Sequence, residues 1–214
     1  MTTSTATKTT TNIQLAISTL HKAFDMANKV LFNNELPSVV ITMHQRGKSN
    51  SLGWFTVNPA WVSGNSEFHE INISPENLNR EPIEIIQTLV HEMIHLHCSV
   101  KGIKDTSRGN AYHNKKFLAE SIAHGFEYLH ESPHPKIGYS QITFTKSTAN
   151  LVKFWNLDKS AFTISRKEFG TGAKDKKKSN IVKWMCGCGV IVRSSRPEVN
   201  IACMDCGTKF EKQD

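Results

Sequence analysis

The sequence lacks any apolar run that approaches the ~20 residues needed to span a bilayer. Its first residues, MTTSTATKTTTN, have no hydrophobic stretch after the charged residue, so we do not expect a secretory signal. Apolar residues are 38% and charged residues 21% of the 214-residue chain, which excludes wholesale disorder and a fibrous protein. We expect a soluble monomer that does not bind membranes and is cytoplasmic, or nuclear if the source is eukaryotic.

Cysteine is also scarce. There are five cysteines, and without a secretory signal they do not predict disulfides. Four of them cluster in the string WMCGCG…CMDCG, as two close pairs separated by 14 residues: Cys186, Cys188, Cys203 and Cys206. This spacing is typical of a structural zinc site, in which each tight turn supplies two thiolates. Four reduced, unligated cysteines are the alternative, and we expect the remaining Cys98 to be a buried thiol.

The first two thirds of the chain lack a net charge. Residues 1–142 contain 12 basic and 12 acidic residues, whereas residues 143–214 contain 14 and 7, so the whole excess of +7 lies in the last third. A basic segment of this kind predicts a polyanionic partner, usually nucleic acid. A solvated linker is the alternative for its densest part, the run of Lys174, Lys176, Lys177 and Lys178.

Aromatic residues occur among these cations, namely Phe154, Trp155, Phe169 and Trp184. Proteins that bind single-stranded nucleic acid stack bases on aromatic rings and contact phosphates with Lys and Arg. We therefore expect DNA, preferably single-stranded, to bind the lysine run and Trp184. For Trp184, a place in the small core around the cysteines is an equally good interpretation.

The apolar periodicity predicts a mixed α+β fold. From Ile13 to Leu31 apolar residues repeat at steps of four and three, which is one face of a helix. A second helix begins at Pro82 and ends near Gly102, and because apolar residues lie all round it we expect it to be buried. A third helix is predicted over residues 114–124. Short strands are predicted over residues 38–44, 52–57 and 68–73.

The second helix contains the sequence His91-Glu92-Met93-Ile94-His95, an HExxH pattern. Residues four apart on a helix lie on one face, so both imidazoles can bind one metal ion. Glu92 lies about 100° round from His91, where it can take a proton from a zinc-bound water without binding the metal itself. Hydrogen-bonded core histidines are the alternative, but three ionisable side chains on a buried helix need compensation.

A catalytic zinc needs a third protein ligand and an open position for water. The longer pattern HExxHxxGxxH is absent, because Cys98 and Lys101 occupy the positions of its glycine and third histidine. His113 is the best candidate, since a short loop can bring it back over the second helix while Phe117 and Leu118 anchor the third helix beneath. Other candidates, with weaker context, are His124, His130 and His134.

Several further elements accompany HEMIH. They are FNNELP at the end of the first helix, ITMHQRGKSNSLGWF, INISP before the second helix, His113 with Phe117 four residues later, and the C-terminal cysteines. Together they resemble the SprT-like zinc metallopeptidases, the family of Spartan-type DNA–protein crosslink proteases, over about residues 12–126 and 181–210. The resemblance implies a zincin-like, minigluzincin-type core followed by a zinc ribbon. It also implies that His91, His95 and His113 bind the catalytic zinc and that Glu92 is the catalytic acid/base.

The function implied by the resemblance is a zinc-dependent endopeptidase that acts on DNA-bound or DNA-crosslinked proteins, with one catalytic and one structural zinc ion. Two alternatives stay open. An ImmA/IrrE-like repressor-cleaving metallopeptidase would use Glu120 as the third ligand, although that kind has no zinc ribbon. A non-catalytic nucleic-acid-binding module would have a structural histidine site, for which a non-ligating Glu92 has no use.

These patterns divide the chain into four segments. We expect a disordered tail over residues 1–10, a metallopeptidase domain over 11–145, a basic connecting segment over 146–178 and a zinc ribbon over 179–214.

Overall fold

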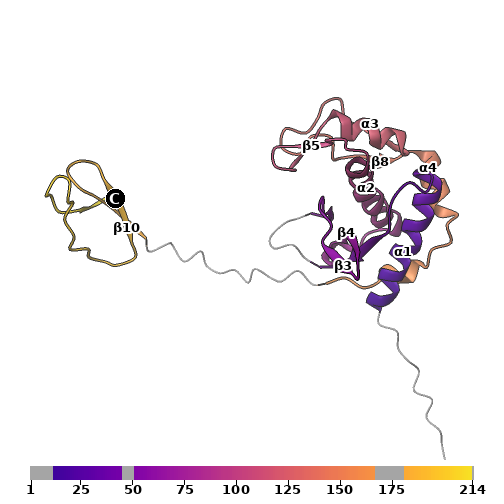
Figure 1. Cartoon of the computed structure of the whole chain (residues 1–214), viewed down its shortest axis with the longest axis horizontal. Helices are drawn as coiled ribbons and strands as arrows, with labels where there is room; N and C mark the ends of the chain where they lie inside the picture. The colour runs from indigo at the N-terminus through magenta and orange to yellow at the C-terminus, as the bar shows by residue number, and fades with distance from the viewer. Residues whose placement is uncertain (1–11, 45–50, 167–180, 214) are drawn as a thin grey trace, which may run out of the picture. The chain divides into compact units, whose positions relative to one another are not determined.

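The computed structural model describes residues 12–44, 51–166 and 181–213. The chain divides into two compact units, an N-terminal unit of Met1–Arg166 and a C-terminal unit of Lys167–Asp214 (Figure 1). Helices and small sheets occur together in the N-terminal unit, which confirms the predicted α+β class. Among the described residues, no helix combines the length and the apolar character that crossing a membrane requires.

The N-terminal unit is built from helices joined by short strands. Its α-helices are α1 (Asn12–Leu31), α2 (Pro82–Val100), α3 (Lys115–Ala123) and α4 (Lys146–Lys153), with 3₁₀ turns η1 (Pro75–Asn77) and η2 (Lys159–Phe162). Its strands are β1 (Val39–Thr42), β2 (Gly53–Phe55), β3 (Trp61–Ser63), β4 (Ser66–Ile73), β5 (Thr106–Ser107), β6 (Tyr112–His113), β7 (Phe126–Glu127) and β8 (Thr143–Phe144).

Strand β4 is the centre of the main sheet. It pairs in parallel with β1 and antiparallel with β2, and its first half pairs with β3. The second half of β4 is buried whereas β3 is exposed along its length, so only the half beside β1 and β2 faces the core. The three strands predicted from the sequence are confirmed, while β3 was not predicted.

Helix α2 is the centre of the N-terminal unit, as its apolar residues on all sides predict (Figure 1). It contacts β2 and β4 of the sheet and the helices α1, α3 and α4. Its start is set locally by Pro82 at the first helical position and by a capping box in which the Glu84 side chain accepts from the backbone N–H of Glu81. The metal-binding pattern therefore lies on an element that is held from several sides.

The segment after residue 145 differs from the expected linker. Helix α4 and η2 pack into the core of the N-terminal unit, where Val152, Trp155, Ala161 and Phe162 are buried. The prediction of a connecting segment over 146–178 is therefore wrong for its first part, because these apolar side chains complete the core beside α1 and α2. Residues 167–178 lie outside the described residues.

The C-terminal unit contains an antiparallel sheet of β9 (Val182–Met185), β10 (Ile191–Ser194) and β11 (Glu211–Gln213), with β9 in the middle. Its small core consists of Trp184, Cys186, Cys203 and Phe210. Trp184 is only 8% exposed. Since a base can stack only on an accessible ring, the structure favours the core interpretation of Trp184 over nucleic-acid binding.

Candidate metal centres

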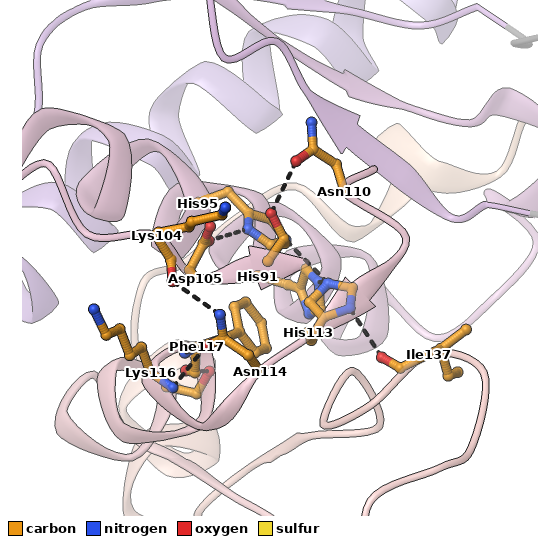
Figure 2. Close-up of polar contacts among 12 residues, drawn as sticks. His91, His95, Lys104, Asp105, Asn110, His113, Asn114, Lys116, Phe117 and Ile137 are labelled. Carbon is orange, nitrogen blue, oxygen red and sulfur yellow. Dashed lines mark hydrogen bonds and ion pairs between the residues drawn. The ribbon is translucent and has the colours of Figure 1, made fainter. Parts of the chain in front are cut away.

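Three imidazoles meet beside α2. His91 and His95 lie one turn apart on this helix, and His113 lies on β6 (Figure 2). The Nε2 atom of His113 is 3.2 Å from Nε2 of His91 and 3.1 Å from Nε2 of His95. Among the candidates of the sequence analysis, the structure therefore brings together His91, His95 and His113, which we call the three-histidine group.

The opposite ring nitrogens show which atoms are available to a metal. Nδ1 of His95 lies 2.5 Å from Oδ2 of Asp105, and Nδ1 of His113 lies 3.2 Å from the carbonyl oxygen of Ile137 (Figure 2). Both oxygens only accept, so each Nδ1 carries a proton and Nε2 is the atom of each ring left to bind a metal. Lone pairs that face one another need a shared cation, and tetrahedral zinc places neighbouring nitrogens about 3.3 Å apart. The three-histidine group fits a zinc ion.

His113 is held in place by segments on both sides of it. Strand β6 pairs with β5, and the backbone of His113 also exchanges hydrogen bonds with Ile137 and Tyr139. At Gly138, which has a φ of 67°, an added Cβ would lie 2.0 Å from the carbonyl oxygen of His113, so only glycine allows this approach. The ring of Phe117 packs against all three imidazoles, as predicted for the anchor of α3.

Burial sets the protonation of this group. Desolvation, reinforced by His95, lowers the pKa of His113 to about 4, and desolvation with the two other imidazoles holds the pKa of His91 well below its usual value. Both rings are therefore neutral near pH 7, as metal ligands must be. Burial raises the pKa of Glu92 to about 7, with His95 opposing and Asp105 adding to this effect.

Glu92 lies between α2 and the sheet. A Cβ added to Gly53 on β2 would lie 3.3 Å from Oε1 of Glu92, 3.1 Å from the Thr88 side chain and 2.8 Å from the carbonyl oxygen of Asn72. The shortest of these contacts is to a backbone oxygen of β4, so glycine at position 53 lets β2 lie close to β4, and the Glu92 carboxylate lies beside it. The pattern HExxH predicts Glu92 but does not predict this close approach of the neighbouring strand.

The other candidates for the third ligand lie elsewhere. His124 and Glu120 form a separate group with His97, so Glu120 does not join His91 and His95. His130 and His134 belong to none of the metal-binding groups found among the described residues. Cys98 is the buried thiol that the sequence predicts, and burial followed by the charge of Asp105 raises the pKa of this thiol, which makes it unreactive.

Four sulfur atoms meet in the C-terminal unit. The Sγ atoms of Cys186 and Cys188 are 3.2 Å apart, those of Cys188 and Cys203 are 3.7 Å apart, and Cys206 completes the group. All five cysteines of the chain are free thiols. Tetrahedral zinc places neighbouring thiolates about 3.8 Å apart, so this four-cysteine group also fits a zinc ion. The side chain of Thr208 lowers the pKa of Cys206 to about 6 by hydrogen bonding to its thiolate.

The basic run that the sequence assigns to nucleic-acid binding, Lys174, Lys176, Lys177 and Lys178, lies outside the described residues.

Asp105 is the functional residue that the sequence reasoning missed. It lies in the loop after α2, and a signal was available, because an imidazole that binds a metal usually donates its other N–H to a carboxylate. Only the folded loop, however, shows which acidic side chain does this. Its partner is His95 (Figure 2).

Replacing Asp105 by Asn is expected to weaken zinc binding at the three-histidine group by about 10- to 100-fold, because the amide no longer holds the protonated Nδ1 of His95 with a charge. Competition with a chromogenic chelator measures this affinity. Asp25→Asn, at an exposed position of α1, is the matched control. An unchanged affinity in Asp105→Asn would show that the carboxylate does not orient His95.

The comparisons with known proteins agree with this geometry. The model of the SprT-like family matches residues 20–132, which is more than half of the chain and includes the whole three-histidine group. No curated protein matches the chain. The SprT-like family is one of zinc-metallopeptidase-like proteins. The chain belongs to the SprT-like family.

Proposed function

We propose that this protein is a zinc-dependent endopeptidase with a zincin-like, minigluzincin-type core, and that it cleaves DNA-bound or DNA-crosslinked proteins. The peptidase proposal rests on one observation. Nε2 of His113 lies within 3.2 Å of Nε2 of both His91 and His95, and the buried Glu92 directly follows His91 on α2. A purely structural metal site has no use for such a carboxylate.

In the proposed reaction His91, His95 and His113 hold the ion. Zinc held there would supply Lewis acidity, which lowers the pKa of water so that it becomes a nucleophile near neutral pH. Glu92 takes the proton of the attacking water and then delivers it to the departing amine. A general base works best with a pKa near the working pH, and in the metal-free protein burial raises the pKa of Glu92 to about 7, from which a bound cation would lower it again. Asp105 keeps the ring of His95 in the orientation that binds metal.

For the C-terminal unit we propose a zinc ribbon with one structural zinc ion on Cys186, Cys188, Cys203 and Cys206. Each pair of thiolates lies on a tight backbone turn, in which the N–H of Gly189 bonds the carbonyl of Cys186 and the N–H of Gly207 bonds that of Cys203. A unit of this size has a core of only a few side chains. Metal binding would therefore supply much of its folding free energy.

The DNA part of the proposal rests on charge. In the described part of the C-terminal unit, Lys183 on β9 and Arg193 on β10 are directly opposite each other, and both are exposed. Like charges at opposite positions of a sheet repel each other, and a bound phosphate backbone would relieve this repulsion. We propose that this pair and the run Lys174, Lys176, Lys177 and Lys178 each contact DNA, and that single strands are preferred.

Replacing Lys183 and Arg193 by Gln in the full chain is expected to weaken binding of single-stranded DNA. The slope of log affinity against log salt should flatten by about 1.4, because each lost phosphate contact contributes roughly 0.7. Fluorescence anisotropy over a salt series measures both quantities. Lys22→Gln with Lys29→Gln, two exposed positions of α1, removes the same charge from the N-terminal unit and should leave the slope unchanged. Equal effects of both pairs would mean that only net charge matters.

The proposed function as a whole is tested by cleavage of a protein crosslinked to single-stranded DNA. Dialysis against a chelator should abolish the cleavage and added zinc should restore it, because the ion is held by neutral imidazoles that release it reversibly. Gel electrophoresis of the crosslinked protein follows the reaction. Cleavage that persists after complete removal of the metal would refute the proposal.

A further inference from the structure

A third group of metal-binding side chains lies away from the two groups described above. It consists of His97 on α2, Glu120 on α3 and His124 at the end of α3, and we call it the His–Glu–His group. One ligand atom from each residue lies within 4.8 Å of the others. His97 is two positions after His95, about 200° round the helix, so it faces away from the three-histidine group.

Glu120 and His124 are four apart at the end of one helix. This is the spacing at which two side chains of a helix lie one above the other and can bind a common ion. Nδ1 of His124 lies 2.7 Å from the backbone carbonyl oxygen of Glu120. A carbonyl only accepts, so this Nδ1 carries a proton and Nε2 is the ring atom left to bind a metal. His113 has the same arrangement with Ile137.

The buried imidazole of His97 has a ring nitrogen that forms no hydrogen bond with the described part of the chain. The residue is 8% exposed, and its Nδ1 is buried without a hydrogen-bond partner in the described part of the chain. Its Nε2 lies 3.5 Å from Oε2 of Glu120, which is long for a hydrogen bond.

The surroundings hold the two rings rigidly. The ring of His124 stacks on the buried ring of Phe32, with centroids 4.4 Å apart, and its centroid is 4.6 Å from that of His97. The nearby cation Lys101 is bound to Glu35 at 2.7 Å, so its charge is partly neutralised by another carboxylate. The Glu120 side chain is 24% exposed and can shorten the distance to the imidazoles by rotation.

We propose that His97, Glu120 and His124 bind a divalent transition-metal ion, for which zinc is the natural probe. Two imidazoles and one carboxylate form a known zinc ligand set, which leaves a fourth position for water. The ion links the C-terminal ends of α2 and α3, the two helices that flank the loop with Asp105 and His113. Its occupancy therefore stabilises the N-terminal unit by mass action, by an amount that rises with the logarithm of the free zinc concentration once this exceeds the Kd.

Zinc per chain is measured by plasma mass spectrometry after dialysis of the 214-residue protein against trace zinc. Glu120→Gln and His124→Gln are each expected to lose about one zinc per chain, because two ligands do not hold the ion. Glu127→Gln and His130→Gln, at exposed positions nearby in the sequence, are the matched controls and should lose none. In a melting experiment, added zinc should raise Tm further in the wild type than in the two ligand variants.

The variant His113→Ala separates this site from the three-histidine group. Combined with Glu120→Gln it should lose about two zinc ions, since the two losses are independent. The third site does not exist as proposed if Glu120→Gln removes no zinc. The same follows if adding Glu120→Gln to His113→Ala removes no further zinc. Circular dichroism of each variant shows that it is folded, and His124→Gln gives an independent reading if Glu120→Gln is not.

Discussion

The variant Glu92→Gln is expected to lose proteolysis by at least about a hundredfold while it keeps its zinc. The amide has the shape of the carboxylate, but it cannot accept the proton of the attacking water. Its fold should be intact, because Glu92 is buried and Gln avoids the cost of a charge there. The rate of cleavage of the crosslinked substrate, the zinc content and Tm together measure these effects.

The control for this variant is Glu127→Gln, at an exposed position of β7. It removes the same charge from the N-terminal unit and should cleave at the wild-type rate. Near-normal cleavage by Glu92→Gln would contradict the peptidase proposal, because no other side chain has been assigned to accept the proton.

The second large effect is expected for His113→Ala. Two helical histidines alone do not hold a catalytic zinc, so the variant should lose about one zinc per chain and all measurable proteolysis. In the wild type, Nε2 of His113 lies 3.1 Å from Nε2 of His95 and 3.2 Å from Nε2 of His91. Removing the imidazole of His113 therefore leaves these two atoms without their third partner. Zinc content and cleavage rate are the measurements.

His130→Ala is the control for His113→Ala, because His130 is exposed and lies in no metal-binding group of the described residues. It should retain zinc and activity. If His113→Ala kept its zinc while Glu120→Ala lost both zinc and cleavage, Glu120 would be the third ligand, as in the ImmA/IrrE-like alternative.

Much of the site was predictable because its determinants are local. The positions of His91 and His95 follow from the helical repeat, and the buried character of α2 follows from its composition. The four-cysteine group follows from spacing along a short stretch of chain. His113 was the favoured third ligand because it comes just before a predicted helix that returns over α2.

The parts that could not be predicted depend on contacts between distant residues. Asp105 is identified only by its approach to His95, and Gly138 only by its contact with His113. The segment with α4 carries many Lys and Ser residues and reads as a linker, yet Trp155 and Phe162 find a place in the core. Trp184 could be a stacking platform or a core residue until the packing of the C-terminal unit is known.

The contacts that hold His113 against residues 137–139 have a consequence for the order in which the site forms during synthesis. The backbone of His113 is hydrogen-bonded to Ile137 and Tyr139. Only glycine at position 138 lets that segment approach the His113 carbonyl oxygen so closely. A ribosome has therefore released more than twenty further residues before His113 is fixed. Under the proposed function, a nascent chain that already contains HEMIH cannot cleave its neighbours until the turn at Gly138 has emerged and folded.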